Sequence, residues 1–130
     1  MARKVGFYNQ LWVSHFPKNE KDVYSVLAAL KDEQFGIFQD GSDFSGSFDL
    51  FEVEGTAHDF KIKMLQTDKK FEFNVEIKPD KSSDFEYSLK IVSGNVPRGP
   101  KVYYTLEEWE VGNNSQLVSA INNFKALSSK

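Results

Sequence analysis

Two histidines, His15 and His58, limit the acid–base chemistry that this chain of 130 residues can offer. His58 precedes Asp59, and a carboxylate beside an imidazole can orient the ring for general-base catalysis. Neighbouring residues on an extended chain point to opposite faces, however, so this pair is more typical of a solvated turn than of a catalytic dyad. No serine stands in a nucleophile elbow. The sequence therefore assigns no catalytic residue and ranks an enzyme below a binding protein.

Metal chemistry has one starting point, the acidic turn at residues 40–43. Its spacing does not fit the EF-hand pattern, which needs a glycine at the sixth position and a glutamate at the twelfth. Ser45 and Phe51 stand at those positions. The chain also has no cysteine, which excludes a thiolate zinc site and a disulfide framework. The sequence therefore predicts neither a metal nor another cofactor.

Residues 94–101 could bind an anion, because they combine two glycines with Arg98 and Lys101. The spacing matches neither a P-loop nor a dinucleotide fingerprint. One hypothesis is a small-ligand protein whose aromatic-lined pocket takes an anionic metabolite or nucleotide at Arg98, Lys101, Tyr103 and Tyr104. The competing interpretation, which we favour, is a stiff connection whose prolines end one strand and begin another.

Charge is distributed unevenly along the chain. Residues 32–60 contain no lysine or arginine and carry eight carboxylates, in a molecule of formal net charge −3. A second acidic group surrounds Trp109, with Glu107 and Glu108 before it and Glu110 after it. Together the two groups predict a negative surface that suits a basic partner. The competing interpretation is that acidic turns only keep the protein in solution.

The leading hypothesis is therefore a non-catalytic binding protein that docks on a basic surface of another macromolecule, as an inhibitor or an immunity factor does. Aromatic rings flanked by acids make good interface anchors. Only two of the sixteen basic residues are arginines, which argues against direct nucleic-acid recognition, and homo-oligomer formation stays open. The predicted partner-binding residues are Asp40, Asp43, Phe44, Phe51, Glu52, Glu54 and Trp109.

The cellular setting follows from composition. The basic start of the chain is not followed by an apolar core, and no apolar run is long enough to span a membrane, so we expect a cytoplasmic protein without membrane contact. The preference for lysine over arginine is typical of AT-rich coding, as in a phage, a mobile element or a low-GC bacterium. The length fits a single domain over residues 1–130.

Strands are the main elements that must position these groups. Three successive stretches, Phe60–Met64, Phe71–Ile77 and Phe85–Ile91, alternate apolar and polar residues, as a strand with one wet and one buried face does. The short polar breaks between them favour an antiparallel meander. Further strands are expected at residues 4–14, 35–38, 48–54 and 101–106.

Helical spacing of apolar residues occurs twice, and it predicts helices at about 20–33 and 115–127. The segment 105–111 fits either a strand or a helical turn capped by Thr105. Both predicted helices would cover the apolar face of a curved sheet of about five to seven antiparallel strands. The sequence therefore predicts a two-layer α+β domain.

Overall fold

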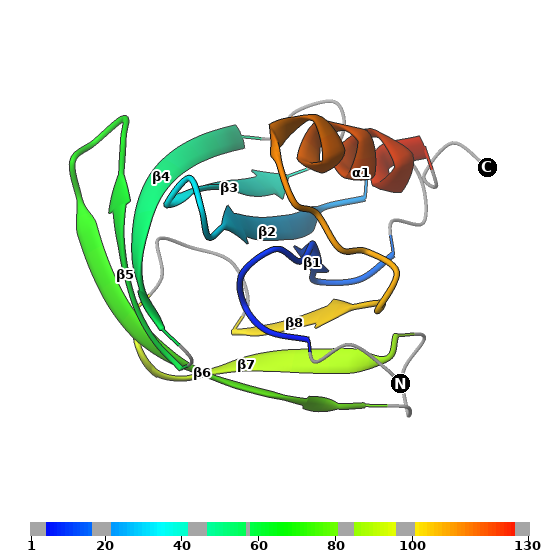
Figure 1. Ribbon diagram of the computed structural model, residues 1–130, viewed down its shortest axis with the longest axis horizontal. Coiled ribbons are helices and arrows are strands. Elements are labelled where there is room, and N and C mark those ends of the chain that lie inside the picture. Colours follow the sequence, from blue (N-terminus) through cyan, green and yellow to red (C-terminus); the bar gives the residue numbers. More distant parts are fainter. Residues whose placement is uncertain are drawn as a thin grey trace.

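Eight antiparallel strands close into a barrel, and one helix lies against the outer wall (Figure 1). The elements are β1 (Trp12–Val13), β2 (Tyr24–Leu30), β3 (Phe35–Gly41), β4 (Ser47–Thr56), β5 (Asp59–Met64), β6 (Lys70–Pro79), β7 (Tyr87–Gly94), β8 (Val102–Thr105) and α1 (Asn114–Ala126). Each strand pairs with the next along the chain, and Val13 pairs with Tyr104 to close the ring. This computed structural model describes residues 5–16, 22–41, 47–56, 58–80, 85–95 and 101–126, without the side chains of 40–41, 47–48, 56 and 125.

The predicted two-layer α+β domain is wrong, because the sheet closes on itself instead of leaving one face for two helices. The predicted helix at 20–33 is also wrong. Its described part forms β2 and a turn at 31–34, where Gln34 has a φ of +51°. All seven residues of β2 are buried, because one face lines the barrel interior and the other lies under α1. A strand covered on both faces has no alternation, so its sequence cannot be told from a buried helix by period alone.

The three alternating stretches are strands, as predicted, and they lie next to one another as β5, β6 and β7. Phe60 pairs with Phe73 across β5 and β6, with both rings in the barrel interior. Phe85 is the exception. It precedes β7, and its side chain packs in the cluster beneath α1 rather than inside the barrel.

Apolar side chains line the described part of the barrel interior. The rings of Phe7, Phe60 and Phe73 meet with centroids 4.4–6.0 Å apart. Phe7 comes from residues 5–11, which enter one end of the barrel; Trp12, fully buried, donates from Nε1 to the Phe7 carbonyl at 3.3 Å. An eight-stranded barrel has room for packed side chains or for one small ligand. The three rings that meet here occupy part of that room.

The first predicted strand, at 4–14, is shorter than expected. Only Trp12 and Val13 belong to the barrel, because Asn9 adopts a φ of +61° and bends the chain. Asparagine tolerates this left-handed conformation better than most residues with a side chain. The bend lets residues before β1 contact the ends of two other segments: Asn9 N–H donates to the Ala29 carbonyl at 2.7 Å, and Val111 N–H donates to the Asn9 carbonyl at 3.1 Å.

Helix α1 is the predicted C-terminal helix, and the described part of it runs from Asn114 to Ala126. Asn113 caps it, since its Oδ1 accepts the Gln116 N–H at 2.9 Å. Leu117, Ile121 and Phe124 are buried against the outer faces of β1, β2 and β3, which form a second core outside the barrel. Each such side chain stabilises the fold by roughly 1.5–3 kcal/mol through burial.

Candidate binding groove beside the C-terminal helix

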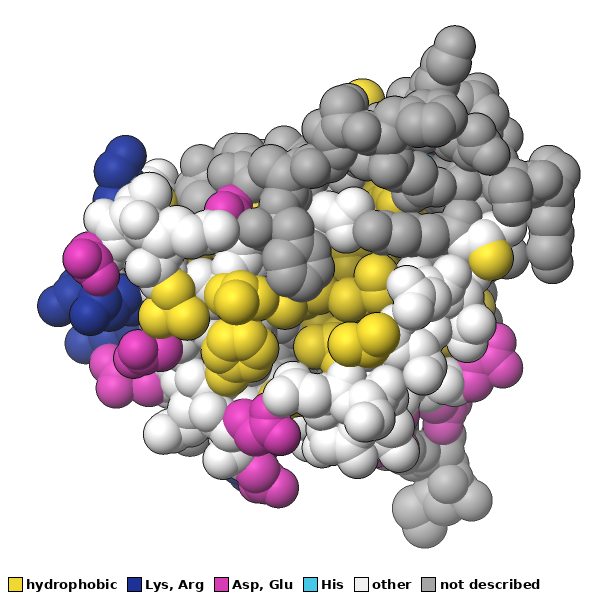
Figure 2. All heavy atoms as spheres, turned by 90° about the horizontal axis from the view of Figure 1, so that it is seen from above, with side chains coloured by type: hydrophobic (Ala, Val, Ile, Leu, Met, Phe, Trp, Pro, Cys, Tyr) yellow, Lys and Arg dark blue, Asp and Glu magenta, His cyan; other side chains and the backbone are white. Residues whose placement is uncertain are grey.

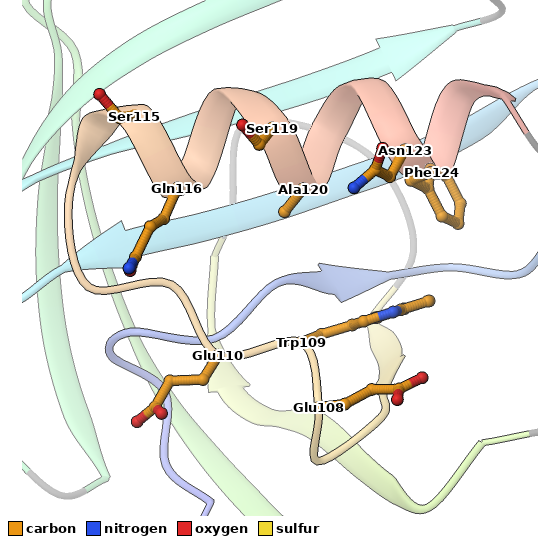
Figure 3. A pocket seen from close by; sticks show the side chains of 9 residues that line it. All are labelled: Glu108, Trp109, Glu110, Ser115, Gln116, Ser119, Ala120, Asn123 and Phe124. Atoms are coloured by element: carbon orange, nitrogen blue, oxygen red, sulfur yellow. The ribbon is translucent and has the colours of Figure 1, made fainter.

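A groove of about 530 Å³ opens between α1 and residues 106–111, the segment that follows β8 (Figure 3). Trp109 forms one side, and its indole extends along the helix. Gln116, Ala120 and Asn123 project toward it from the other side. Because Ala120 has only a methyl group, the space facing the indole stays open.

The segment 105–111, which the sequence left open between a strand and a helical turn, does not continue the strand and contains a hydrogen-bonded turn. Strand β8 ends at Thr105, and the chain turns so that Trp109 N–H donates to the Leu106 carbonyl at 2.9 Å. The Trp109 carbonyl then accepts the Leu11 N–H at 3.1 Å. The N–H and the carbonyl of Trp109 are therefore both hydrogen-bonded, which fixes the backbone position from which the indole extends.

A buried polar network lies beneath this turn. Gln10 and Thr105 are both fully buried. Gln10 Nε2 donates to Thr105 Oγ1 at 2.8 Å and to the Leu106 carbonyl at 2.6 Å, and Thr105 Oγ1 donates to the Leu11 carbonyl at 2.6 Å. Satisfied networks of this kind rigidify their surroundings, because every alternative geometry leaves a buried polar group unpaired.

Three aromatic rings hold the indole of Trp109. Phe16, Phe85 and Phe124 meet it edge-to-face, with centroids 5.8–5.9 Å away and interplanar angles of 70–83°. Aromatic pairs in this geometry contribute about 0.5–1.5 kcal/mol each beyond the area they bury. Trp109 is half-buried by these contacts and still reaches the surface. It is therefore a rigid aromatic surface that solvent, or a partner, can reach.

The groove is electronegative. Two of its described lining residues, Glu108 and Glu110, are carboxylates, and none is lysine or arginine. Both are exposed and flank Trp109 on the side away from the helix (Figure 3). On the helix side, Gln116 is oriented by its own hydrogen bond, in which Oε1 accepts the Gly112 N–H at 2.6 Å. The arrangement suits a positively charged group with a flat apolar face.

Glu52 and Glu54, two of the acidic residues predicted from the window at 32–60, lie elsewhere. Glu52 and Glu54 are exposed on the outer face of β4, opposite Lys63 and Lys61 of β5, and Phe51 is fully buried inside the barrel. The first two line a separate groove of about 450 Å³, whose charges are mixed. Seen from the α1 side, basic side chains gather at one edge of the molecule, over β5 and β6 (Figure 2).

Of the other predicted partner-binding residues, only part can be placed. Asp40 lies on β3, opposite Ser25 and Ser47, but its side chain is not described. Asp43 and Phe44 fall outside the described residues. Trp109 is the predicted anchor that lies in the electronegative groove.

The residues proposed for an anion pocket do not share one face. Tyr103 and Tyr104 are consecutive on β8, so Tyr103 is buried inside the barrel while Tyr104 faces outward and stacks on Phe85 with centroids 5.3 Å apart. Lys101 is exposed just before β8, and Arg98 falls outside the described residues.

The two histidines lie apart from the groove. His15 Nε2 is 3.2 Å from Asp22 Oδ2, and its Nδ1 is 3.1 Å from Ser14 Oγ. This chain of groups has the composition of a hydrolytic triad, but Ser14 Oγ accepts the Ser25 N–H at 2.9 Å and ties β1 to β2. His58 is exposed in the turn before β5. Within the described ranges, no three histidine, aspartate or glutamate side chains converge on a metal position.

The sequence predicted the side of the groove formed by Trp109 and its acidic neighbours, but it did not predict the side formed by α1. The acids around Trp109 were visible as a pattern, whereas Phe16 and Phe85 reach the indole from distant segments. Ala120 lies within the predicted helix at 115–127, where a small residue gave no sign of facing a cavity. A signal was nevertheless present in the twelve phenylalanines of the chain, several of which form this cluster.

Fold and groove together define a closed up-and-down barrel with an electronegative aromatic groove on its outer wall. No family model, curated protein or solved structure matches this chain. None of the helical segments among the described residues has the length and apolar character needed to cross a bilayer.

Proposed function

We propose that this chain is a non-catalytic binding protein that docks on a basic surface of another protein through the groove at Trp109. The observation that carries the proposal is a half-buried indole that reaches the surface, held by three rings, with a carboxylate on each chain neighbour. Tryptophan is enriched among the residues that contribute most to interface affinity. Carboxylates around it would attract a basic partner and speed association.

A ligand pocket inside the barrel has less support. Its proposed lining residues Tyr103 and Tyr104 point to opposite faces of β8, and aromatic rings pack together in the described interior. An enzyme has less support as well, because neither His15 nor His58 lines the groove at Trp109 or the groove beside Glu52 and Glu54. Recognition on the outer wall needs no change in the packed interior.

Tryptophan fluorescence offers a direct test. The chain has two tryptophans, and Trp12 is fully buried, so acrylamide quenching reports mainly on Trp109. We expect a peptide of alternating lysine, arginine and glycine to protect Trp109 from quenching, with an affinity that falls as salt rises. An otherwise identical peptide with glutamate in place of the basic residues should have no effect.

Two charge-matched variants locate the site. The double variant Glu108→Gln and Glu110→Gln should weaken binding of the basic peptide by tenfold or more. The double variant Glu52→Gln and Glu54→Gln changes the net charge by the same amount on the outer face of β4, and it should bind like the wild type. Equal losses in both variants, or no protection of Trp109 by the basic peptide, would refute the proposal.

A further inference from the structure

We infer that the groove accepts an arginine side chain of the partner, with the guanidinium stacked on Trp109 beneath Ala120. This inference rests on the proposed function and specifies the chemistry of the same site. It follows from the shape of the groove, from its charges and from its hydrogen-bonding groups.

The shape of the groove suits a flat group. The indole extends along α1, and the small side chain of Ala120 faces it from the helix (Figure 3). Gln116 and Asn123 project on either side of Ala120, about one helical turn apart from it in each direction. The result is a slot with an aromatic floor, a methyl roof and an amide at each end. A planar guanidinium fits such a slot and stacks favourably on an indole face.

The charges favour arginine over lysine. Glu108 and Glu110 flank the indole, and a guanidinium offers several N–H donors in one plane to such acceptors. An ammonium is a compact and strongly hydrated charge, which loses more solvation when it enters a half-buried slot. The methylene stem of arginine can also lie along the exposed edge of Trp109.

Hydrogen bonds around the slot are already ordered. Gln116 Oε1 is engaged by the Gly112 N–H, and the Trp109 backbone is fixed by Leu106 and Leu11. A partner side chain therefore meets a preformed site, which reduces the entropy lost on binding.

Three peptides that differ at one position test the inference. In the sequence Gly-Lys-Gly-X-Gly-Lys-Gly, X is arginine, lysine or citrulline, the uncharged analogue of arginine with the same planar end. Calorimetry should give an affinity about five- to tenfold higher for arginine than for lysine, as expected for a cation stacked on an indole. Citrulline should bind more weakly than arginine, because it lacks the charge that the two glutamates attract.

Two substitutions on one helix locate the arginine. Ala120→Phe fills the slot and should remove the preference for arginine over lysine. Val118→Phe adds the same ring to α1 at a side chain that is 57% exposed, and it should leave the preference unchanged. Should Ala120→Phe fail to fold, the double variant Glu108→Gln and Glu110→Gln provides the same readout from exposed positions.

The outcomes separate the inference from the proposed function. Equal affinity for arginine and lysine peptides, with salt-dependent protection of Trp109, would overturn the inference and leave the proposed function standing. Protection of Trp109 by none of the peptides would overturn both. Equal loss of the arginine preference in the Ala120 and Val118 variants would show that arginine binds outside the slot.

Discussion

Replacing Gly36 with alanine tests the barrel directly. A Cβ at this position in β3 would lie 2.4 Å from the Ala28 carbonyl oxygen and 2.5 Å from a ring carbon of Phe51. Real Cβ atoms essentially never approach a neighbour within 3.0 Å. The oxygen belongs to the backbone of β2, and Phe51 is fully buried in the barrel, so neither neighbour can move away cheaply.

The size of the effect follows from these two contacts. Adding a methyl group to a packed core typically costs about 1–3 kcal/mol. Because one contact is with backbone, relief of the clash at Gly36 requires β2 and β3 to separate locally, and we expect the upper end of this range. For a chain of this length, about 3 kcal/mol corresponds to a fall of roughly 10 °C in the melting temperature.

Thermal and urea unfolding measure this loss, and Gly6→Ala is the matched control. A Cβ at Gly6 meets nothing within 4 Å, so that variant should stay within about 0.5 kcal/mol of the wild type. Adding Phe51→Leu to Gly36→Ala should relieve only the ring contact and leave the backbone clash. A Gly36→Ala protein as stable as the wild type would mean that β2 does not pair with β3 in this register.

Three further predictions concern single interactions. Thr105→Val removes a hydroxyl that two buried partners share, and it should lower the free energy of unfolding by about 1–3 kcal/mol in urea titrations; an unchanged midpoint would contradict the network. Burial, and then the charge of Glu54, raise the pKa of Tyr8 above its usual value. Because the folded-state pKa is raised, the contribution of Tyr8 to the free energy of unfolding is fully present below about pH 10 and is lost as the pH rises through the folded-state pKa. Tyr8→Phe should therefore lose stability less steeply with pH above that value than the wild type does, and identical pH slopes for the two proteins would disprove this. Lys61 and Glu72 lie 3.7 Å apart but are both exposed, so a double-mutant cycle should give a coupling of at most about 0.5 kcal/mol that shrinks in salt; a larger, salt-independent coupling would contradict it.

The periodicity of apolar residues correctly predicted the strands and the helix that have one buried face and one solvent-exposed face. Strands β5 and β6 have a wet face and a buried face, so their alternation is visible in the sequence. Helix α1 has one buried stripe, and it was predicted for the same reason. Strand β2 has no wet face, and its pattern was therefore mistaken for a helix.

Closure of the barrel could not be predicted in this way. It depends on the pairing of β1 with β8, in which the described pair in register is Val13 and Tyr104, about 90 positions apart in the sequence. No local pattern reports such a contact. The same limit applies to the groove, where the chemistry of Trp109 was visible in its neighbours but the helix wall that faces it was not.

The groove lies between two parts of the structure, α1 and the turn that carries Trp109, which are each held in place but do not fill the space between them. Helix α1 is held to the outer wall by Leu117 and Ile121, and Trp109 is held by the turn after β8 and by the rings around it. From the helix, Ala120, Phe124 and polar side chains line the gap, and the small side chain of Ala120 leaves space in front of the indole. The side chains of Glu108 and Glu110 are exposed, so their substitution by glutamine should weaken binding far more than it lowers the free energy of unfolding.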